Sequence, residues 1–423
     1  MSHRVSARSA ETIARDLKAS IADGIGFSVM VGCGEMFIGA FALAVGLGPT
    51  LAGLVSTLPI VFGALVQSLA PLAVARLGTN RGWCVLCVVL QAASFLPMAW
   101  WAWSGHAPAA GIFAAVGLYW ASGMASSPAW NAWIGTLVPA GERVAFFAHR
   151  NHLSQAGVLA GFVAAGAALQ YGKQFDLTLD VFAILFVVAS AARFFSAFQL
   201  TRCSEPEPPA VLAAIVSPRR SHERTVLMSP TGWLLCYLWS VVAGAQFAAP
   251  YFTPYMLDEM GFSYWAYMVV FATGLLSKSL SLPLLGRLAS RIGSVRLLRL
   301  SGLAVAPLTL LWIVSADLRY LVGVQVLAGC CWAAFELAMT LVFFDAISNR
   351  DRATVVSAHT IGTAFATVVG AAAGGFLLKS LGEDRTAYYT LFGVAAALRL
   401  FTLPLLLKLR SSRLVGNDAS APA

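Results

Sequence analysis

The chain is organised around two short polar stretches, GRLASRIGSVR at residues 286–296 and PLAVARLGTNR at residues 71–81. Each lies between two long apolar runs. They share an arginine, a glycine and a second arginine at the same spacing, 215 positions apart: Arg76, Gly78, Arg81 and Arg291, Gly293, Arg296. A match kept over this distance indicates that the second half of the chain repeats the first.

Further matches extend the repeat along the chain. One pair, Gly46 and Gly261, has the same offset of 215. At an offset of 209 the matched pairs are Arg143 with Arg352, Gly161 with Gly370, and Gly166 with Gly375. At an offset of 206 they are Leu185 with Leu391, Phe186 with Phe392, Arg193 with Arg399, and Phe195 with Phe401. Short loop insertions explain the small changes in offset, and the conserved order predicts two parallel copies.

Composition identifies the solvent around these copies as lipid. Of the 423 residues, 59% are hydrophobic and only 11% are charged, whereas soluble domains carry roughly a quarter charged residues. Apolar runs of about 20 residues, long enough to cross a bilayer as helices, are expected at 24–46, 51–73, 83–103, 109–134, 153–171, 179–200, 232–255, 264–285, 297–315, 319–345, 355–379 and 387–407. The runs are continuous and do not alternate, which predicts an all-α membrane protein of twelve transmembrane helices.

The distribution of positive charge predicts the orientation. Of the 28 Lys and Arg residues, 21 fall on the side of the N-terminus, 4 on the opposite side and 3 inside spans. Because cytoplasmic loops carry the excess of Lys and Arg, both termini are expected in the cytoplasm, in a multi-pass protein of the inner membrane of a bacterium. A net charge of +9 spread over such loops does not indicate nucleic-acid binding.

Five segments follow from this pattern. Residues 1–23 are expected to form a cytoplasmic amphipathic lead-in, in which Ile13, Leu17 and Ile21 share one face. Six helices over 24–200 form the N-terminal half. A cytoplasmic linker over 201–231 contains the helix-breaking run SEPEPP. Six more helices over 232–407 form the C-terminal half, and 408–423 form a cytoplasmic tail.

The six-plus-six repeat and the quoted stretches resemble the major facilitator superfamily of transporters. The signature of that family, G-x-L-A-D-R-x-G-x-x-R, is similar to residues 286–296, beginning at Gly286. The resemblance implies that the glycines and arginines of both stretches belong to a cytoplasmic gate; anchoring to the cytoplasmic surface is the alternative explanation. The acidic position of the signature is Ser290 in one copy and Ala75 in the other, so the charge latch of the family is in doubt.

Glycines in two spans also resemble a family pattern. The runs around Gly157, Gly161 and Gly166 and around Gly370, Gly374 and Gly375 are similar to the G-P-x-x-G-G motif of antiporters, without its proline. Close packing of helices explains the same glycines.

Charged residues inside spans are costly and indicate functional or paired positions. Glu35 lies in the first span after two small residues, Gly32 and Gly34. We expect it to bind a proton or cation; the alternative is a neutral glutamic acid bonded to the backbone. Lys278 and Glu336 are expected at similar depth as an ion pair, either opened by substrate or permanent.

Other intramembrane groups complete the candidate site. Arg193 and Arg399 occupy matching positions in spans 6 and 12, which implies an inherited structural role, with substrate binding as the alternative. Polar and aromatic residues of cavity-lining spans are further substrate-site candidates: Trp130, Asn131, Gln67 and Gln246. Interfacial anchoring is the alternative for Trp130.

These features predict a secondary transporter that moves a small organic solute by alternating access, coupled to protons. A nucleotide-binding P-loop is absent from the sequence, and no cofactor or metal is expected. The partners expected are the solute, protons and membrane lipid, with the protein a monomer. A membrane enzyme is disfavoured because the six histidines form no H-x-x-x-H motif in a span; a receptor or scaffold without transport remains the alternative.

Overall fold

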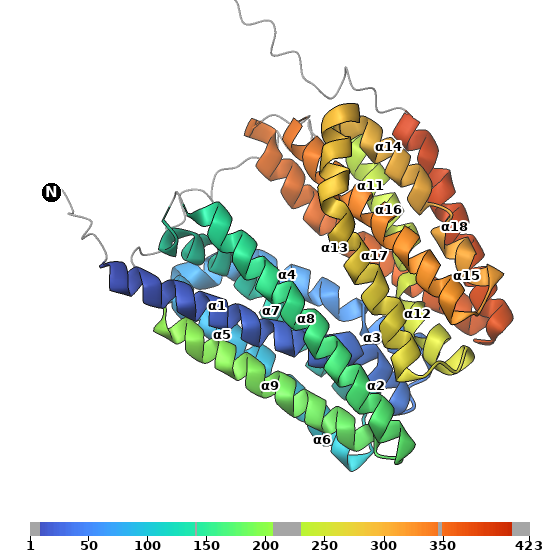
Figure 1. Ribbon diagram of the computed structural model, residues 1–423, viewed down its shortest axis with the longest axis horizontal. Coiled ribbons are helices and arrows are strands. Elements are labelled where there is room, and N and C mark those ends of the chain that lie inside the picture. The colour runs from blue at the N-terminus through green and yellow to red at the C-terminus, as the bar shows by residue number, and fades with distance from the viewer. Residues whose placement is uncertain (1–8, 140–141, 206–229, 346–348, 408–423) are drawn as a thin grey trace, which may run out of the picture. The chain divides into compact units, whose positions relative to one another are not determined.

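The computed structural model describes residues 9–139, 142–205, 230–345 and 349–407 (Figure 1). Within these ranges all regular structure is helical. The longer helices are α1 (Ala10–Cys33), α2 (Ile38–Ala44), α3 (Pro49–Val55), α4 (Leu58–Leu77), α5 (Asn80–Ala93), α6 (Phe95–Ser104), α7 (Ala109–Leu137), α8 (Arg143–Gln174), α9 (Thr178–Arg202), α11 (Pro230–Gln246), α13 (Tyr264–Ile292), α14 (Ser294–Val305), α16 (Leu318–Asp345), α17 (Asn349–Ser380) and α18 (Arg385–Leu407). Short turns are η1 (Glu35–Phe37), η2 (Ala249–Tyr251), α12 (Phe252–Pro254), η3 (Tyr255–Glu259), η4 (Leu308–Leu310) and α15 (Leu311–Val314).

Twelve segments of the described chain are long and apolar enough to cross a membrane. Each overlaps one of the predicted spans, so the predicted all-α fold with twelve transmembrane helices is confirmed. The first span begins earlier than expected. Helix α1 starts after Ser9, whose side chain caps it by accepting from the Thr12 backbone N–H at 3.2 Å, and runs unbroken to Cys33. Asp23 lies inside this helix, so no helix boundary separates the expected lead-in of residues 1–23 from the first span. The linker beyond residue 205 and the tail from residue 408 lie outside the described residues.

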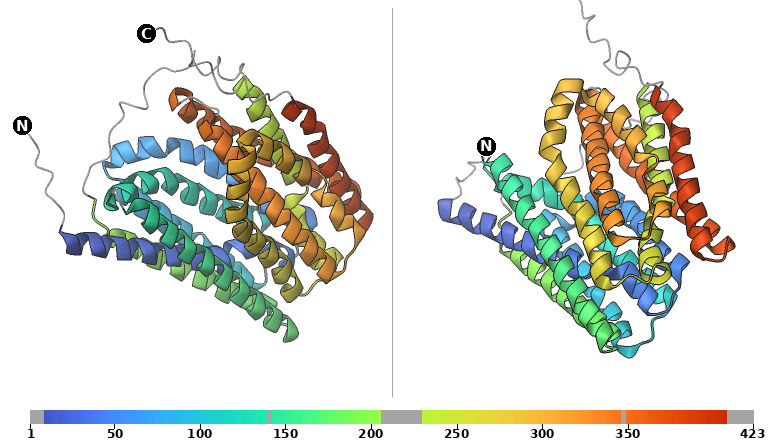
Figure 2. Two further views of the ribbon diagram at one scale, coloured as in Figure 1. Left: turned by 45° about the horizontal axis from the view of Figure 1, so that its top comes forward. Right: turned by 45° about the vertical axis from the view of Figure 1, so that its right-hand side comes forward.

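The contacts divide the chain into two units, residues 1–47 with 59–217, and residues 48–58 with 218–423. In the first unit α1 packs against α8 and α9, and α5 packs against α7 (Figure 2). In the second unit α11 packs against α17 and α18, and α14 packs against α16. These are the same neighbours under the repeat. The internal repetition read from the sequence is therefore a repetition of packing.

The matched glycines have matching conformations. Gly46 and Gly261 adopt φ of 81° and 62°, and Gly78 and Gly293 adopt φ of 70° and 83°. These values lie in the left-handed region, which glycine enters without a steric penalty. Gly78 and Gly293 each follow the last turn of a helix and donate a backbone N–H to the carbonyl four residues earlier, at 2.8 Å. Their retention in both copies reflects this turn geometry.

Spans 1 and 7 are interrupted at equivalent places. In span 1 the α-helix ends at Cys33, and the 3₁₀ turn η1 joins it to α2; in span 7 α11 ends at Gln246 and η2 follows. Interrupted helices leave backbone groups that a neighbouring helix or a cavity must satisfy. The interruption in span 1 places Glu35 at a helix break.

Helix α3 begins the second span but belongs to the second unit. It packs against α17 and η2. The Glu383 carboxylate accepts hydrogen bonds from the backbone N–H of Thr50, at 3.3 Å, and from the Thr50 hydroxyl. The Tyr251 hydroxyl donates to the Ala371 carbonyl at 2.6 Å, and its ring lies against Gly53. This segment therefore packs within the second unit, although the sequence places it in the expected N-terminal half.

The glycines that resemble the antiporter motif lie at helix contacts. A Cβ atom on Gly161 would meet the Gly32 Cα at 3.3 Å, where α8 crosses α1. A Cβ atom on Gly370 would lie 2.3 Å from the Ala243 carbonyl oxygen, where α17 crosses α11. Close packing accounts for these positions.

Gly370→Ala is therefore expected to lower the stability of the protein by about 1–3 kcal/mol, because α17 and α11 must separate to admit the methyl group. The control is Gly393→Ala, since a Cβ atom there meets nothing within 4 Å. Thermal unfolding of both variants in detergent measures the difference. Equal unfolding temperatures would contradict the packing described.

Candidate functional site

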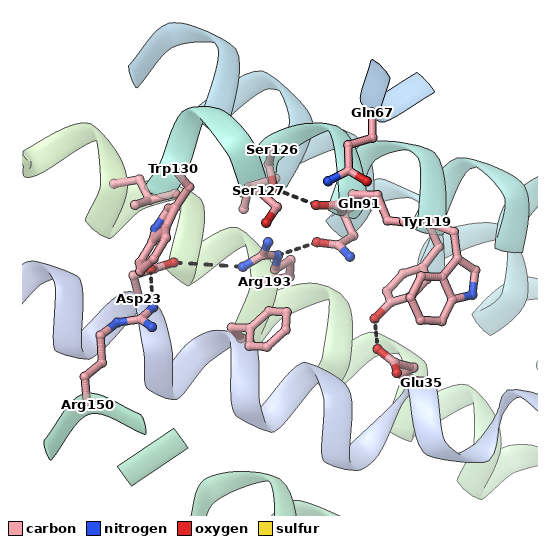
Figure 3. Close-up of a pocket in the computed structure, with 16 residues that line it drawn as sticks. Asp23, Glu35, Gln67, Gln91, Tyr119, Ser126, Ser127, Trp130, Arg150 and Arg193 are labelled. Carbon is pink, nitrogen blue, oxygen red and sulfur yellow. Dashed lines mark hydrogen bonds and ion pairs between the residues drawn. The ribbon is translucent and has the colours of Figure 1, made fainter. Parts of the chain in front are cut away.

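A cavity of about 370 Å³ lies within the first unit. It is lined by side chains from α1, η1, α4, α5, α7, α8 and α9 (Figure 3). Ligand pockets for small molecules begin at about 300 Å³, so the cavity can hold a small organic molecule. Four of its lining residues carry charges: Asp23, Glu35, Arg150 and Arg193.

Glu35 stands at one end of the cavity. Its carboxylate accepts a hydrogen bond from the hydroxyl of Tyr119, which projects from α7. The helix break explains how the carboxylate reaches the cavity: Gly34 packs against the Phe95 ring, and the chain turns as η1. Phe95 also contacts Tyr119 edge-on, at 5.3 Å between ring centroids. Among the described residues, the carboxylate therefore lies beside aromatic rings and accepts its hydrogen bond from a neutral donor, the Tyr119 hydroxyl.

Asp23 forms a cluster with two arginines at another part of the cavity. Its Oδ2 lies 2.9 Å from Arg150 Nη2, and its Oδ1 lies 3.9 Å from Arg193 Nη1 (Figure 3). The Ser196 hydroxyl donates to Oδ1 at 2.7 Å. Asp23 is 2% exposed and Arg193 is 5% exposed. The three charges come from α1, α8 and α9, so the cluster joins three spans.

Neutral groups hold the two guanidinium groups in place. Arg193 Nε donates to the Gln91 side-chain oxygen at 2.8 Å, and Nη1 donates to Ser196 Oγ at 2.8 Å. Arg150 Nε donates to the Ser20 carbonyl at 3.0 Å, and its guanidinium lies over the Trp130 ring at 4.4 Å. A buried arginine needs several such partners.

The structure brings three of the seven predicted substrate-site residues into this cavity: Glu35, Gln67 and Trp130. Asn131 is exposed and donates to the Ser127 carbonyl of its own helix at 2.9 Å. Gln246 lies in the second unit, at the end of α11. Neither of these two lines the cavity.

Lys278 and Glu336 form the expected pair, in the second unit. Lys278 Nζ lies 2.7 Å from both carboxylate oxygens of Glu336. The side chains are 38% and 48% exposed, so the pair lies at the surface formed by α13 and α16. It differs in this respect from the buried cluster of the first unit.

The matched arginines of spans 6 and 12 have different partners. Arg399 is 3% exposed and donates to the carbonyls of Ala395 and Val305, each at 3.0 Å, and to Thr309 Oγ1. Arg193 instead faces a carboxylate and lines the cavity. The arginine is the same in both copies, but its hydrogen-bond and ion-pair partners differ. The shared position therefore does not imply a shared role.

The residues of the two quoted stretches lie at helix ends. Arg76, Arg291, Arg296 and Gly286 are exposed. Arg81 Nη1 donates to the Cys203 carbonyl at 3.3 Å. The Glu205 carboxylate accepts from the Asn80 and Arg81 backbone N–H groups, at 2.6 and 3.3 Å, and from the Thr79 hydroxyl. Although Ala75 replaces the acidic residue of the signature, a carboxylate from the end of α9 thus reaches the first turn of α5.

The cavity residues that the sequence did not predict include Asp23, Gln91, Tyr119 and Arg150. Asp23 ends the expected lead-in and Arg150 lies between two expected spans, because the apolar runs are shorter than the helices that contain them. A polar residue one or two turns outside an apolar run is the signal that could have found both. Tyr119 and Gln91 carry no such signal in spans rich in aromatic residues.

Within the described residues, no three His, Cys, Asp or Glu side chains are placed to hold a metal ion. The candidate site is therefore one of carboxylates, arginines and aromatic rings, a chemistry suited to binding and proton exchange.

Comparison with solved structures places the fold among membrane transporters. A variant of the nucleoside transporter NupG aligns with a TM-score of 0.73 at 12% identity, over 93% of this chain and 99% of that chain. A bacterial homolog of the human lysosomal transporter Spinster, inward-facing and occupied, has a TM-score of 0.69 at 16% identity, over 98% and 99%. The xylose transporter XylE from E. coli, inward open, has a TM-score of 0.67 at 12% identity, over 96% and 99%. These identities establish the fold alone.

The twelve candidate spans thus indicate a multi-pass membrane protein, and its fold is the one that these transporters share. Residues 234–423 match the family model of the Major Facilitator Superfamily. No curated protein matches the sequence.

Gln91→Leu tests whether the Gln91 amide stabilises the cluster of Asp23, Arg150 and Arg193. Removal of the amide leaves the buried Arg193 without one of its acceptors, and an unsatisfied buried polar group costs about 1–3 kcal/mol. Gln67→Leu is the control, since Gln67 lines the same cavity but is half-buried. A lower thermal unfolding temperature is expected for Gln91→Leu only, and equal temperatures would count against the cluster as described.

Proposed function

We propose that the protein is a proton-coupled secondary transporter that moves a small organic solute by alternating access. Glu35 is the proton site. The observation that carries this proposal is a carboxylate at a helix break, in a cavity of the first unit, with Tyr119 as its hydrogen-bond partner. A carboxyl group removed from water can exchange a proton near neutral pH, and the cavity beside it has room for a solute.

The cellular setting follows the charge distribution of the sequence. We place the protein in the inner membrane as a monomer surrounded by lipid, with both termini in the cytoplasm. The exposed arginines of the two quoted stretches then lie at the cytoplasmic surface, where Arg81 and Glu205 bind the end of α9 to the start of α5. We propose that these contacts form part of the cytoplasmic gate.

Lys278 and Glu336 are proposed as a second polar element on the transport path. Ionic groups exposed to hydrocarbon are costly, so the exposed face of this pair is expected to meet water or protein.

Proton coupling is tested with Glu35→Gln. Purified protein is reconstituted into proteoliposomes that contain a pH-sensitive dye, and a library of small organic compounds is added. In the wild type, compounds that are substrates should move protons. In Glu35→Gln the compounds should still exchange across the membrane but without proton movement, because the amide cannot release a proton.

Asp180→Asn is the control, since it removes an exposed carboxylate that does not line the cavity and should leave proton movement through Glu35 intact. Proton movement that survives in Glu35→Gln would show that coupling lies elsewhere. A wild-type protein that moves neither protons nor any compound of the library would favour the receptor or scaffold alternative.

The Lys278–Glu336 pair is tested by a double-mutant cycle. If the pair is permanent, Lys278→Gln and Glu336→Gln should each lower the unfolding temperature, and the double variant should recover part of the loss. If substrate opens the pair, the single variants should change substrate affinity more than stability. Thermal unfolding and compound binding on the same samples separate the two outcomes.

A further inference from the structure

The cluster of the first unit has one more positive charge than negative. Asp23 is a single carboxylate, and it is shared by Arg150 and Arg193. All three residues line the cavity. A net charge in a water-poor site is costly unless it is paired, so the balance of this cavity depends on its remaining charged group, Glu35.

The charge of the cavity changes with the proton on Glu35. The charged and titratable side chains that line it in the described chain are Asp23, Arg150, Arg193, Glu35 and Tyr119. With Glu35 ionised and Tyr119 neutral, two carboxylates balance two guanidinium groups. With Glu35 protonated, one positive charge is left over. The remaining polar side chains of the lining are amides, hydroxyls and indoles and add no charge: Gln67, Gln91, Ser126, Ser127, Trp120 and Trp130.

A ligand in the cavity can reach the two guanidinium groups that carry the unbalanced positive charge. The contacts described above use Nε and Nη1 of Arg193 and Nε and Nη2 of Arg150. A guanidinium group has five N–H donors, so Nη2 of Arg193 and Nη1 of Arg150 remain as donors for a ligand. Their neighbours include aromatic rings: Phe27 lies 5.0 Å from the Arg193 guanidinium, and Trp130 lies 4.4 Å from that of Arg150.

We propose that the cargo is a small organic monoanion, a carboxylate, which binds to Arg193 and Arg150 when Glu35 carries a proton. This inference rests on the proposed function and names the substrate class of the same site. Carboxylates form charge-assisted, fork-shaped hydrogen bonds with arginine. Anion and proton then enter the cavity together and restore its neutrality, so one proton accompanies each carboxylate and the transported pair carries no net charge.

A cationic cargo fits the cluster less well. Of the described carboxylates, Asp23 is the one that pairs with these arginines, and it is already bonded to Arg150 and Ser196 and faces Arg193. A cation would have to displace a guanidinium group and approach two positive charges. The arrangement therefore favours an anion over a cation.

The test uses three matched series of compounds on the purified full-length protein: acetate, benzoate and 1-naphthoate, with the amides and the amines of the same skeletons. Between pH 6 and 8 the carboxylates stay ionised. At least one carboxylate should bind, measured by calorimetry, and should bind more tightly at pH 6 than at pH 8 with uptake of close to one proton. Its amide and amine should bind at least about tenfold more weakly. An amide or amine that binds as tightly, or a complete lack of carboxylate binding, would overturn the proposal.

Variants locate the site. Arg193→Lys keeps the positive charge but loses the planar guanidinium that can bind both carboxylate oxygens. It should weaken carboxylate binding about tenfold. Arg399→Lys, its repeat-related counterpart outside the cavity, should leave binding unchanged. Asp23→Asn should strengthen binding, because it adds one unit of net positive charge. Where Arg193→Lys does not fold, Arg150→Gln serves instead. Unchanged binding in Arg193→Lys or Arg150→Gln, or weaker binding in Asp23→Asn, would refute the assignment.

The two proposals fail in different ways. If Glu35→Gln binds carboxylate independently of pH, the variant behaves as the protonated state and both proposals stand. If carboxylate binding needs Arg193 but Glu35→Gln retains its pH dependence, the anion site stands and the proton site is wrong. If Glu35→Gln abolishes proton movement but carboxylates have no advantage over amides, the proton site stands and the anion site is wrong.

Discussion

Charge inside a membrane must be paired, and in the first unit this requirement converges on the carboxylate of Asp23. Its partners come from α8 and α9, the two helices that pack along α1. Ser196 and Gln91 complete the bonding of Arg193, so the arrangement extends from α9 to α5. The position of these four helices and the electrostatics of the cavity therefore depend on the same set of bonds. A change that relocates the carboxylate alters both packing and charge.

Much of the fold could be predicted from the sequence because a membrane span is defined by the hydropathy of residues that are consecutive in the chain. Twelve apolar runs are read directly from hydropathy, and glycines such as Gly78 and Gly293 keep a left-handed turn in both copies. The candidate site was only partly predictable, because burial depends on neighbours distant in sequence. Glu35 was found as a charge in an apolar run, whereas Arg150 was assigned to a loop, since it lies just before the apolar part of α8. The hydrogen bond that ties Arg150 to the cluster joins it to Asp23, 127 positions away in the sequence.

The comparison of the two units shows how duplicated sequence acquires separate chemistry. Arg193 and Arg399 are both buried and occupy equivalent positions, yet one faces a carboxylate and the other faces backbone carbonyls and a threonine. The second unit has its own ion pair, Lys278 with Glu336, in a more exposed place. The helices remained alike while the polar side chains between them diverged, as expected if packing limits the scaffold more strongly than the site.

Helix α3 changes the topology of the chain. Residues 48–58 belong to the second unit although they lie between two spans of the first. The polypeptide therefore passes between the units three times: before residue 48, after residue 58 and through the central linker. A single proteolytic cut in the linker would leave two fragments. The N-terminal fragment would still contain α3, which packs against α17 and η2 and is hydrogen-bonded to Glu383, all in the C-terminal fragment. Helix α3 thus belongs to the second unit through its own contacts, although the chain on both sides of it belongs to the first.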